Sequence, residues 1–311
     1  MSKHTFERMS SICYADHHHG NGAHYFVRIN QPSADSPGVH KEFEYYQSLR
    51  HLFNFPAMRL GETSQGTVLV VKRAEGIPLS QAIKTHPKQA RLSLESYYGD
   101  LEKSWEKTRR PMDSTECSKD LRTYNMGLLE VMPGDLPEIV DKELIVNGQN
   151  YPSVGNMCRE VKGRLEAFDE PWMVFSHGDE HLDNIFSSPD GRYQMIDPFN
   201  TGYTSMAQVF NKHLGETALF NYDYQTTSQV NGKVEIETSL SPQSKQVREL
   251  IEPPLNELKQ KIGSQVHINE YLFTLMLRGA TLRIAPKWRD LAIERTMAYL
   301  AMATEYYAKS I

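Results

Sequence analysis

Three polar side chains between residues 179 and 197 have the types and the spacing that phosphoryl transfer requires. Asp179 is followed five residues later by Asn184, and Asp197 comes after a short turn. Phosphoryl transfer needs a carboxylate that orients the attacking hydroxyl and accepts its proton, and oxygen ligands for magnesium on the nucleotide phosphates. Because magnesium keeps several waters, one amide and one carboxylate suffice as protein ligands. A loop bearing Asp179 and Asn184, near a strand that ends at Asp197, supplies that set.

Short strands are predicted on either side of a turn in this region. The segment 172–179, WMVFSHGD, leads into the loop, and the segment 193–197, YQMID, ends at the second aspartate. Between them, SSPDGR contains Pro189, Asp190 and Gly191, which are residue types that favour turns. The sequence therefore predicts that a strand, a loop and a hairpin position the three polar side chains.

A family resemblance rests on the same stretch of the chain. It is carried by His177-Gly178-Asp179, Asn184-Ile185-Phe186 and Met195-Ile196-Asp197. These residues resemble the signature of the aminoglycoside phosphotransferase and choline kinase superfamily: H-G-D, four residues, N, then a strand pair ending in I-D. The resemblance implies an α+β protein with the two-lobed, protein-kinase-like fold. It implies that Asp179 is the catalytic base and that Asn184 and Asp197 bind Mg2+. His177 would brace the loop.

The first 76 residues predict the order strand, strand, helix, strand, strand. The predicted elements are ERMSSICYAD (7–16), AHYFVRIN (23–30), KEFEYYQSLRHL (41–52) and two strands within RLGETSQGTVLVVK (59–72). The first two segments are short and rich in β-branched and aromatic residues, and Phe43, Tyr46 and Leu49 have helical spacing. A turn, HHHGNG (17–22), separates the first two strands.

The resemblance also implies nucleotide-binding residues in this β-rich segment. Arg28 lies on the strand that presents a basic residue to the phosphates, and Glu42 is the candidate ion-pair partner, with Glu44 as a second option. Arg binds phosphate in a forked geometry, so it can serve where protein kinases use Lys. The backbone around Val71, Lys72 and Arg73 would border the base of ATP or GTP; the donor nucleotide is left open.

Two departures from the family pattern concern the phosphates and the segment after Asp197. The first eleven residues, MSKHTFERMSS, contain no glycine, so a phosphate lid would have to come from Ser10, Ser11 or the 17–22 turn. Ser205 stands where family members carry a further acidic residue.

From Leu79 onward the sequence is mainly helical, with apolar residues three and four apart. Hairpins are expected at Asn147-Gly148 and, as an insertion, at Asn231-Gly232. We therefore expect a nucleotide-binding lobe over residues 1–76 and a helical lobe over residues 77–311 that carries the catalytic loop and the acceptor site. The hinge would fall at Gly76-Ile77-Pro78.

Composition limits the classes of partner. The 311 residues are 39% hydrophobic and 23% charged, with a formal net charge of −5, which gives no reason to expect nucleic acid or an anionic membrane surface. Three scattered cysteines suggest neither a disulfide framework nor a zinc ribbon. The N-terminus lacks an apolar core typical of a secretory signal. We expect a soluble cytoplasmic protein that binds a nucleoside triphosphate and a small-molecule acceptor; the oligomeric state is open.

Several alternatives stay open at this point. The three polar residues could be turn and cap residues. His177, Asp179, His181 and Asp183 alternate, which would suit a metallohydrolase if the segment were a strand. Glu180 and Asp183 could attract a cationic substrate or lie on a solvated surface. His17, His18 and His19 could bind metal or lie on a solvated turn.

The sequence thus predicts an ATP-dependent phosphotransferase for a hydroxyl of a small polar metabolite. The candidate acceptors are a sugar, an amino alcohol and an aminoglycoside. The competing hypothesis is a non-catalytic nucleotide-binding protein that keeps the fold, and the missing glycine-rich loop favours it.

Overall fold

The computed structural model of the protein divides into two compact units. It describes residues 6–8, 11–14, 25–29, 38–64, 66–111, 121–137, 139–167, 172–199, 201–205, 213, 222–230, 232–240, 242–262, 268–284 and 293–311. The first unit contains Met1–Thr108 and Phe175–Tyr203, and the second contains Arg109–Val174 and Thr204–Ile311. The predicted boundary at residue 76 is a different division of the chain and remains a prediction.

A five-stranded antiparallel sheet forms one part of the first unit. Its strands are β1 (Phe6–Arg8), β2 (Ser11–Tyr14), β3 (Tyr25–Ile29), β4 (Met58–Thr63) and β5 (Gly66–Lys72), in the order β1-β2-β3-β5-β4. The single strand predicted over residues 7–16 is wrong, because β1 and β2 pair with each other and Arg8 lies opposite Ser11. The predicted turn at 17–22, with its three histidines, lies outside the described residues.

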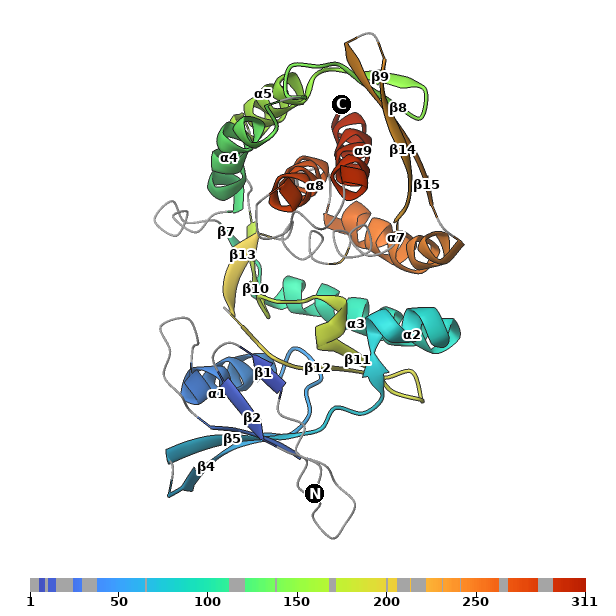
Figure 1. Ribbon diagram of the computed structural model, residues 1–311. Helices are drawn as coiled ribbons and strands as arrows, with labels where there is room; N and C mark the ends of the chain where they lie inside the picture. Colours follow the sequence, from blue (N-terminus) through green and yellow to red (C-terminus); the bar gives the residue numbers. More distant parts are fainter. Residues whose placement is uncertain are drawn as a thin grey trace. The chain divides into compact units, whose positions relative to one another are not determined.

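Helix α1 (Gly38–Leu49) covers one face of this sheet (Figure 1). Val39 and Tyr46 of α1 join Met58 and Leu69 in a buried cluster, with further apolar side chains packed around it. These helix residues are spaced so that they share one face, which explains why this segment folds as a helix against a sheet. The predicted helix is confirmed, although it begins earlier than residue 41.

A second layer of the first unit supports the loop 177–184, which the sequence predicts to be catalytic and which is called the catalytic loop below. It contains β6 (Ile77–Pro78), α2 (Leu79–Thr85), α3 (Pro87–Thr108), the short 3-10 helix η3 (Leu182–Asn184), β11 (Ile185–Ser187) and β12 (Tyr193–Met195). The small sheet has the order β12-β11-β6, so β11 lies between the strand after Gly76 and its own hairpin partner. The hairpin predicted around Pro189, Asp190 and Gly191 is confirmed.

Gly76 is fixed in place by a close approach of two backbone segments. Its φ is 91°, and a Cβ added there would lie 1.9 Å from the carbonyl oxygen of Ser187. Only glycine fits such a position. Glycine at this position therefore allows β6 to pair with β11. The hinge expected at Gly76 remains a prediction.

Three short strands lie in the sequence close to the positions where the chain passes from one unit to the other. They are β7 (Arg110–Pro111), β10 (Trp172–Ser176) and β13 (Gly202–Ser205). Strand β10 pairs with β7 through Trp172–Pro111 and Met173–Arg110. It then continues into the catalytic loop.

The second unit contains α4 (Leu121–Val131), η2 (Met132–Asp135), α5 (Val154–Glu166), α7 (Pro242–Ile262), α8 (Ile268–Ile284) and α9 (Ile293–Ser310). Its strands are β8 (Leu144–Val146), β9 (Gln149–Tyr151), β14 (Tyr222–Val230) and β15 (Lys233–Leu240), in the order β14-β15-β8-β9. Helices α8 and α9 pack together at the core of this unit (Figure 1).

Both predicted hairpins of the second unit are confirmed. Strand β15 also pairs in parallel with β8, with Val234 opposite Leu144, which joins them into one sheet. In the described parts of the chain, no helix is both long and apolar enough to cross a membrane.

Candidate active site

The catalytic loop runs from His177 to Asn184, between β10 and β11. The main-chain N–H of His181 donates to the carbonyl of Asp179 at 2.9 Å, and the N–H of Asn184 donates to the carbonyl of His181 at 2.9 Å. The amide Nδ2 of Asn184 donates to the carbonyl oxygen of Asp179 at 3.0 Å and to its carboxylate Oδ2 at 3.3 Å. The first two predicted site residues are therefore in direct contact.

Asp197 reaches the same place from the other end of the hairpin. The N–H of Ile196 donates to the carbonyl of Asn184 at 2.9 Å. This hydrogen bond joins the end of the hairpin to the loop, and Asp197 is the next residue after it. Asp197 adopts a left-handed backbone with φ of 52°. Side chains other than glycine rarely take this conformation, and it is concentrated at functional sites. The structure thus brings Asp179, Asn184 and Asp197 together.

His177 is completely buried and bonded on both ring nitrogens. Nε2 lies 2.9 Å from the carbonyl oxygen of Ile196, and Nδ1 accepts the N–H of Asp179 at 3.4 Å. Burial is the main cause that lowers the pKa of His177, so the ring is neutral, with its proton on Nε2. The ring also stacks on Phe55, with centroids 5.8 Å apart. These contacts are the ones expected of a residue that braces the loop.

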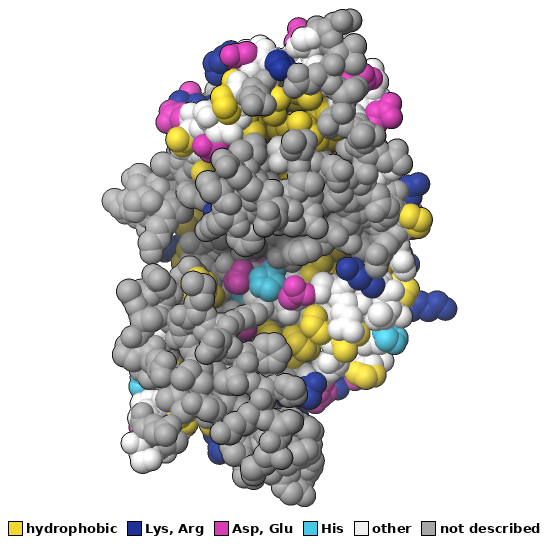
Figure 2. Space-filling model, viewed as in Figure 1, with side chains coloured by type: hydrophobic (Ala, Val, Ile, Leu, Met, Phe, Trp, Pro, Cys, Tyr) yellow, Lys and Arg dark blue, Asp and Glu magenta, His cyan; other side chains and the backbone are white. Residues whose placement is uncertain are grey.

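His181 lies beside the carboxylate of Asp179. Its Nε2 is 3.4 Å from Oδ2 of Asp179, and the two side chains are 23% and 28% exposed. Figure 2 shows a histidine between acidic side chains on the visible surface. Oδ2 of Asp179 therefore has two nitrogen neighbours, His181 and Asn184.

The loop does not have the shape that the metallohydrolase hypothesis needs. Residues 177–184 form a turn and the 3-10 helix η3, so alternate side chains do not share one face. His177 is buried against Phe55, whereas Asp183 is exposed and accepts a hydrogen bond from Ser80. The geometry gives that hypothesis no support.

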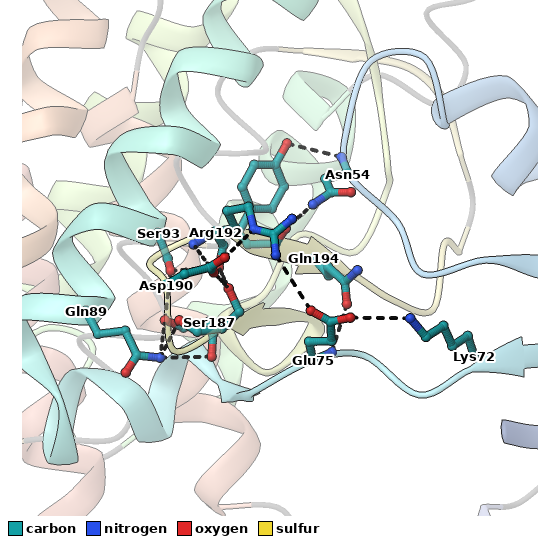
Figure 3. A network of polar contacts seen from close by, with 11 residues as sticks. Asn54, Lys72, Glu75, Gln89, Ser93, Ser187, Asp190, Arg192 and Gln194 are labelled. Carbon is teal, nitrogen blue, oxygen red and sulfur yellow. Dashed lines mark hydrogen bonds and ion pairs between the residues drawn. The ribbon is translucent and has the colours of Figure 1, made fainter. Parts of the chain in front are cut away.

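A network of mostly uncharged contacts anchors the β11–β12 hairpin (Figure 3). Gln89 of α3 donates to the carbonyl of Ser188 at 2.6 Å, and the hydroxyls of Ser93 and Ser187 lie 2.7 Å apart. Asn54 donates to the carbonyl of Tyr193 at 2.6 Å. Because this hairpin begins after Asn184 and ends before Asp197, the network fixes the distance between them.

A second group of contacts ties the same hairpin to the segment after β5. The N–H of Glu75 donates to Gln194 Oε1 at 2.8 Å, and its carboxylate lies 3.3 Å from Lys72 Nζ and 3.9 Å from Arg192. Lys72 is thus engaged at its side chain, and its N–H donates to Ala57 at 2.8 Å.

The predicted nucleotide residues lie on α1, β3 and β5, except Arg73, which is exposed and follows β5 directly. Arg28 is opposite Leu69 and Cys13 in the sheet; its side chain lies outside the described residues. Glu42 is 8% exposed on the face of α1 that meets the sheet, whereas Glu44 is exposed, and the ion pair of Arg28 with either remains a prediction. Val71 lies inside the sheet between Phe26 and Met58.

Glu180 has a place in the structure that neither of the two sequence-based hypotheses for it predicted. It is fully buried, so it is neither a solvated surface charge nor a residue that could attract a cationic substrate. Charged residues are rarely buried without a partner, and no periodicity in this loop separates Glu180 from the exposed Asp183.

No protein-family model matches the sequence, and no curated protein matches it either. Among solved structures, the aminoglycoside phosphotransferase APH(4)-Ia, as a thermostable mutant in its apo form, is similar with a TM-score of 0.55 and 13% identity, over 98% of this chain and 94% of that chain. A thermostable mutant of the same enzyme in ternary complex with AMP-PNP and hygromycin B has a TM-score of 0.56 and 13% identity, over 97% and 93%. Choline kinase LicA from Streptococcus pneumoniae has a TM-score of 0.50 and 13% identity, over 99% and 94%. The chain therefore has the two-lobed, protein-kinase-like fold of the aminoglycoside phosphotransferases and choline kinases, as the motif implied.

Proposed function

We propose that this protein is an ATP-dependent phosphotransferase that phosphorylates a hydroxyl of a small polar metabolite. The acceptor classes that we consider are a sugar, an amino alcohol and an aminoglycoside. One observation carries the proposal: the carboxylate of Asp179 contacts Asn184, and the bond from Ile196 to Asn184 puts Asp197 beside them. This is the set that hydroxyl activation and magnesium binding need.

Asp179 acts as the base in this mechanism. The acceptor oxygen attacks the terminal phosphorus, the bond to the leaving nucleoside diphosphate breaks, and the hydroxyl proton passes to the Asp179 carboxylate. The contacts of Oδ2 with Asn184 and His181 hold the carboxylate in one orientation. Orientation of this kind contributes much of the rate in phosphoryl transfer, since little covalent chemistry is required of the protein.

Asn184 and Asp197 are suited to bind Mg2+. The side-chain nitrogen of Asn184 is used by Asp179, so its carbonyl oxygen is left as a metal ligand, and Asp197 adds a carboxylate. Hard oxygen ligands of this kind are those that Mg2+ prefers. When bound, Mg2+ would neutralise charge on the nucleotide phosphates.

The nucleotide would lie along β3, β5 and the segment after β5. We propose that Arg28 steadies the phosphates and that the buried Glu42 orients it, since Arg28 is opposite Leu69, whose side chain lies in the cluster covered by α1. The base would meet the backbone that follows Val71, at Lys72 and Arg73. The similar enzyme that binds AMP-PNP together with hygromycin B supports a nucleotide and a small acceptor here.

The second candidate is a nucleotide-binding protein without catalysis. It is favoured by the N-terminal segment, because no glycine occurs before residue 20 and Arg8 of β1 pairs with Ser11 of β2. Such a protein would bind MgATP and stimulate no turnover with any acceptor.

The test is ADP release with ATP and magnesium across aminoglycosides, amino alcohols and sugars, using the wild type and Asp179→Asn. Acceptor-stimulated release that is lost in the variant supports the phosphotransferase and identifies its acceptor class. Nucleotide binding without stimulation by any acceptor supports the second candidate.

A further inference from the structure

Glu180 follows Asp179 directly, and it is a charged residue type with no exposed surface (0%). Its Oε1 accepts two hydrogen bonds, one from the main-chain N–H of His177 at 2.8 Å and one from the hydroxyl of Ser176. Its Oε2 is buried and has no hydrogen-bond partner in the part of the chain that the structure describes. Burial of a carboxyl group is costly unless it is well bonded, so a position like this calls for a specific role.

The surroundings of Glu180 show that it points into the protein and not toward a substrate. In the part of the chain that the structure describes, the hydrogen-bond donors to Glu180 are an uncharged hydroxyl and a backbone amide, from Ser176 and His177. Its charge also contributes, after burial, to raising the pKa of Tyr97, whose ring packs against Phe53 and Tyr193 in the layer beneath the loop. Glu180 therefore acts on the reaction through other residues.

The contacts of Glu180 lead to Asp179 in two steps. Ser176 Oγ donates to Glu180 and accepts the N–H of Gly178 at 3.0 Å, while the N–H of His177 donates to Glu180 directly. The next N–H, that of Asp179, donates to the His177 ring at 3.4 Å. Three consecutive backbone amides are thus held, two of them by way of Glu180, and Gly178 supplies the left-handed φ of 85° that the turn requires.

We propose that Glu180 is a positioning residue, which holds the backbone of His177 and Gly178 and thereby sets the place of the Asp179 carboxylate. The inference rests on the proposed phosphotransferase function, because it concerns the base of that reaction. The acceptor atom Oε1 performs this role, so an amide that keeps a carbonyl oxygen in the same place preserves it. Removal of the acceptor lets the turn relax, and displacement of a catalytic group by about 1 Å can cost roughly 100-fold in rate.

The experiment compares Glu180→Leu with Glu180→Gln. Glu180→Leu fills the site but removes the acceptor, and we expect kcat to fall roughly 10- to 100-fold with an unchanged nucleotide Kd. Glu180→Gln keeps the acceptor and should restore kcat to within about threefold. Glu95→Gln is the matched control, since it makes the same chemical change as Glu180→Gln at an exposed side chain of α3 in the same unit and should leave kcat unchanged. A Glu180→Leu enzyme with wild-type kcat, or a Glu180→Gln enzyme as impaired as Glu180→Leu, would overturn the inference.

Hydrogen–deuterium exchange of the peptide that spans 172–185 gives a second readout that needs no activity. The amides of His177 and Gly178 should exchange faster in Glu180→Leu and in Ser176→Ala, and at the wild-type rate in Glu180→Gln. Unchanged exchange in both Glu180→Leu and Ser176→Ala contradicts the inference. If the wild type turns over no acceptor, the proposed function fails, and this exchange comparison alone decides the positioning role.

Discussion

In the unit that carries the predicted catalytic loop, hydrogen bonds of uncharged side chains are among the shortest contacts between the β11–β12 hairpin and its support, beside the longer Glu75–Arg192 ion pair, whereas in the other unit ion pairs connect helices. Gln89, Ser93 and Asn54 bond to the β11–β12 hairpin at 2.6–2.7 Å. In the second unit, Glu305 of α9 lies 2.7 Å from Arg248 of α7 and 2.8 Å from Lys309. Buried neutral bonds depend steeply on geometry, while partly exposed ion pairs depend on salt and contribute little each.

The difference suggests how each unit responds to change. In the first unit, hydrogen bonds hold two backbone segments and several side chains in place near the proposed base. Small displacements of these groups should therefore affect activity. The second unit should lose stability gradually, with little effect on the rate of the chemical step. Three substitutions compare these behaviours, in order of decreasing effect.

The largest effect is expected for Gly76→Ala. The added Cβ would meet the Ser187 carbonyl at 1.9 Å, so β6 and β11 must separate, and the free energy of unfolding should fall by about 3 kcal/mol or more. Gly148→Ala is the matched control in the second unit, because Gly148 has a φ of 77° and nothing within 4 Å of its added Cβ. It should lose only about 1–2 kcal/mol, from backbone strain. Urea unfolding measures both, and equal losses would contradict the role of the close approach.

A smaller effect is expected when His177 is replaced, and it concerns the pH dependence of the free energy of unfolding. Burial is the largest cause that lowers its pKa in the folded protein, so the unfolded chain binds more protons between the folded and unfolded pKa values. The free energy of unfolding should therefore fall as the pH drops through the unfolded value of about 6.5. His177→Gln should flatten this slope, whereas His51→Gln, at an exposed position, should not. Equal slopes in all three proteins would rule out the buried neutral ring.

The smallest effect is expected for Glu305→Gln in the second unit. Burial raises the pKa of Glu305, but Arg248 and Lys309 outweigh it and hold the pKa below its usual value. The pairs therefore stabilise the protein at neutral pH, and that stability is lost as the pH falls through the pKa of Glu305. At low salt, unfolding measurements should show a loss of about 0.5–1 kcal/mol, and in 1 M salt most of it should disappear. An equal loss of unfolding free energy at low salt and in 1 M salt would mean that the substitution disturbs packing and not charge.

The parts of the site that the sequence predicted are those encoded locally. Asp179, Asn184 and Asp197 lie within one strand, loop and hairpin, and the turn at Pro189 to Gly191 fixes how the chain returns. The spacing alone therefore indicates that they meet. In the same way, local periodicity predicted α1, and the Asn-Gly turn residues predicted both hairpins of the second unit.

What the sequence could not show depends on contacts between distant segments. The parallel pairing of Val234 with Leu144 joins strands that are far apart in the chain. The burial of Glu180 depends on the packing of α3 beneath the loop, and neighbouring Asp183 has the same charge but is exposed. Residues 7–16 contribute to two strands because Arg8 pairs with Ser11. The amino-acid composition of that segment does not indicate this pairing.

The central claim is that Asp179 is the base and that Asp197 binds magnesium, and one paired measurement tests it most directly. The kcat and the Kd for MgATP are determined for the wild type, Asp179→Asn and Asp197→Ala with the best acceptor. The account predicts that Asp179→Asn lowers kcat by roughly 10²- to 10⁴-fold with nearly unchanged nucleotide affinity, while Asp197→Ala abolishes magnesium-dependent nucleotide binding. An unchanged kcat in Asp179→Asn would contradict it.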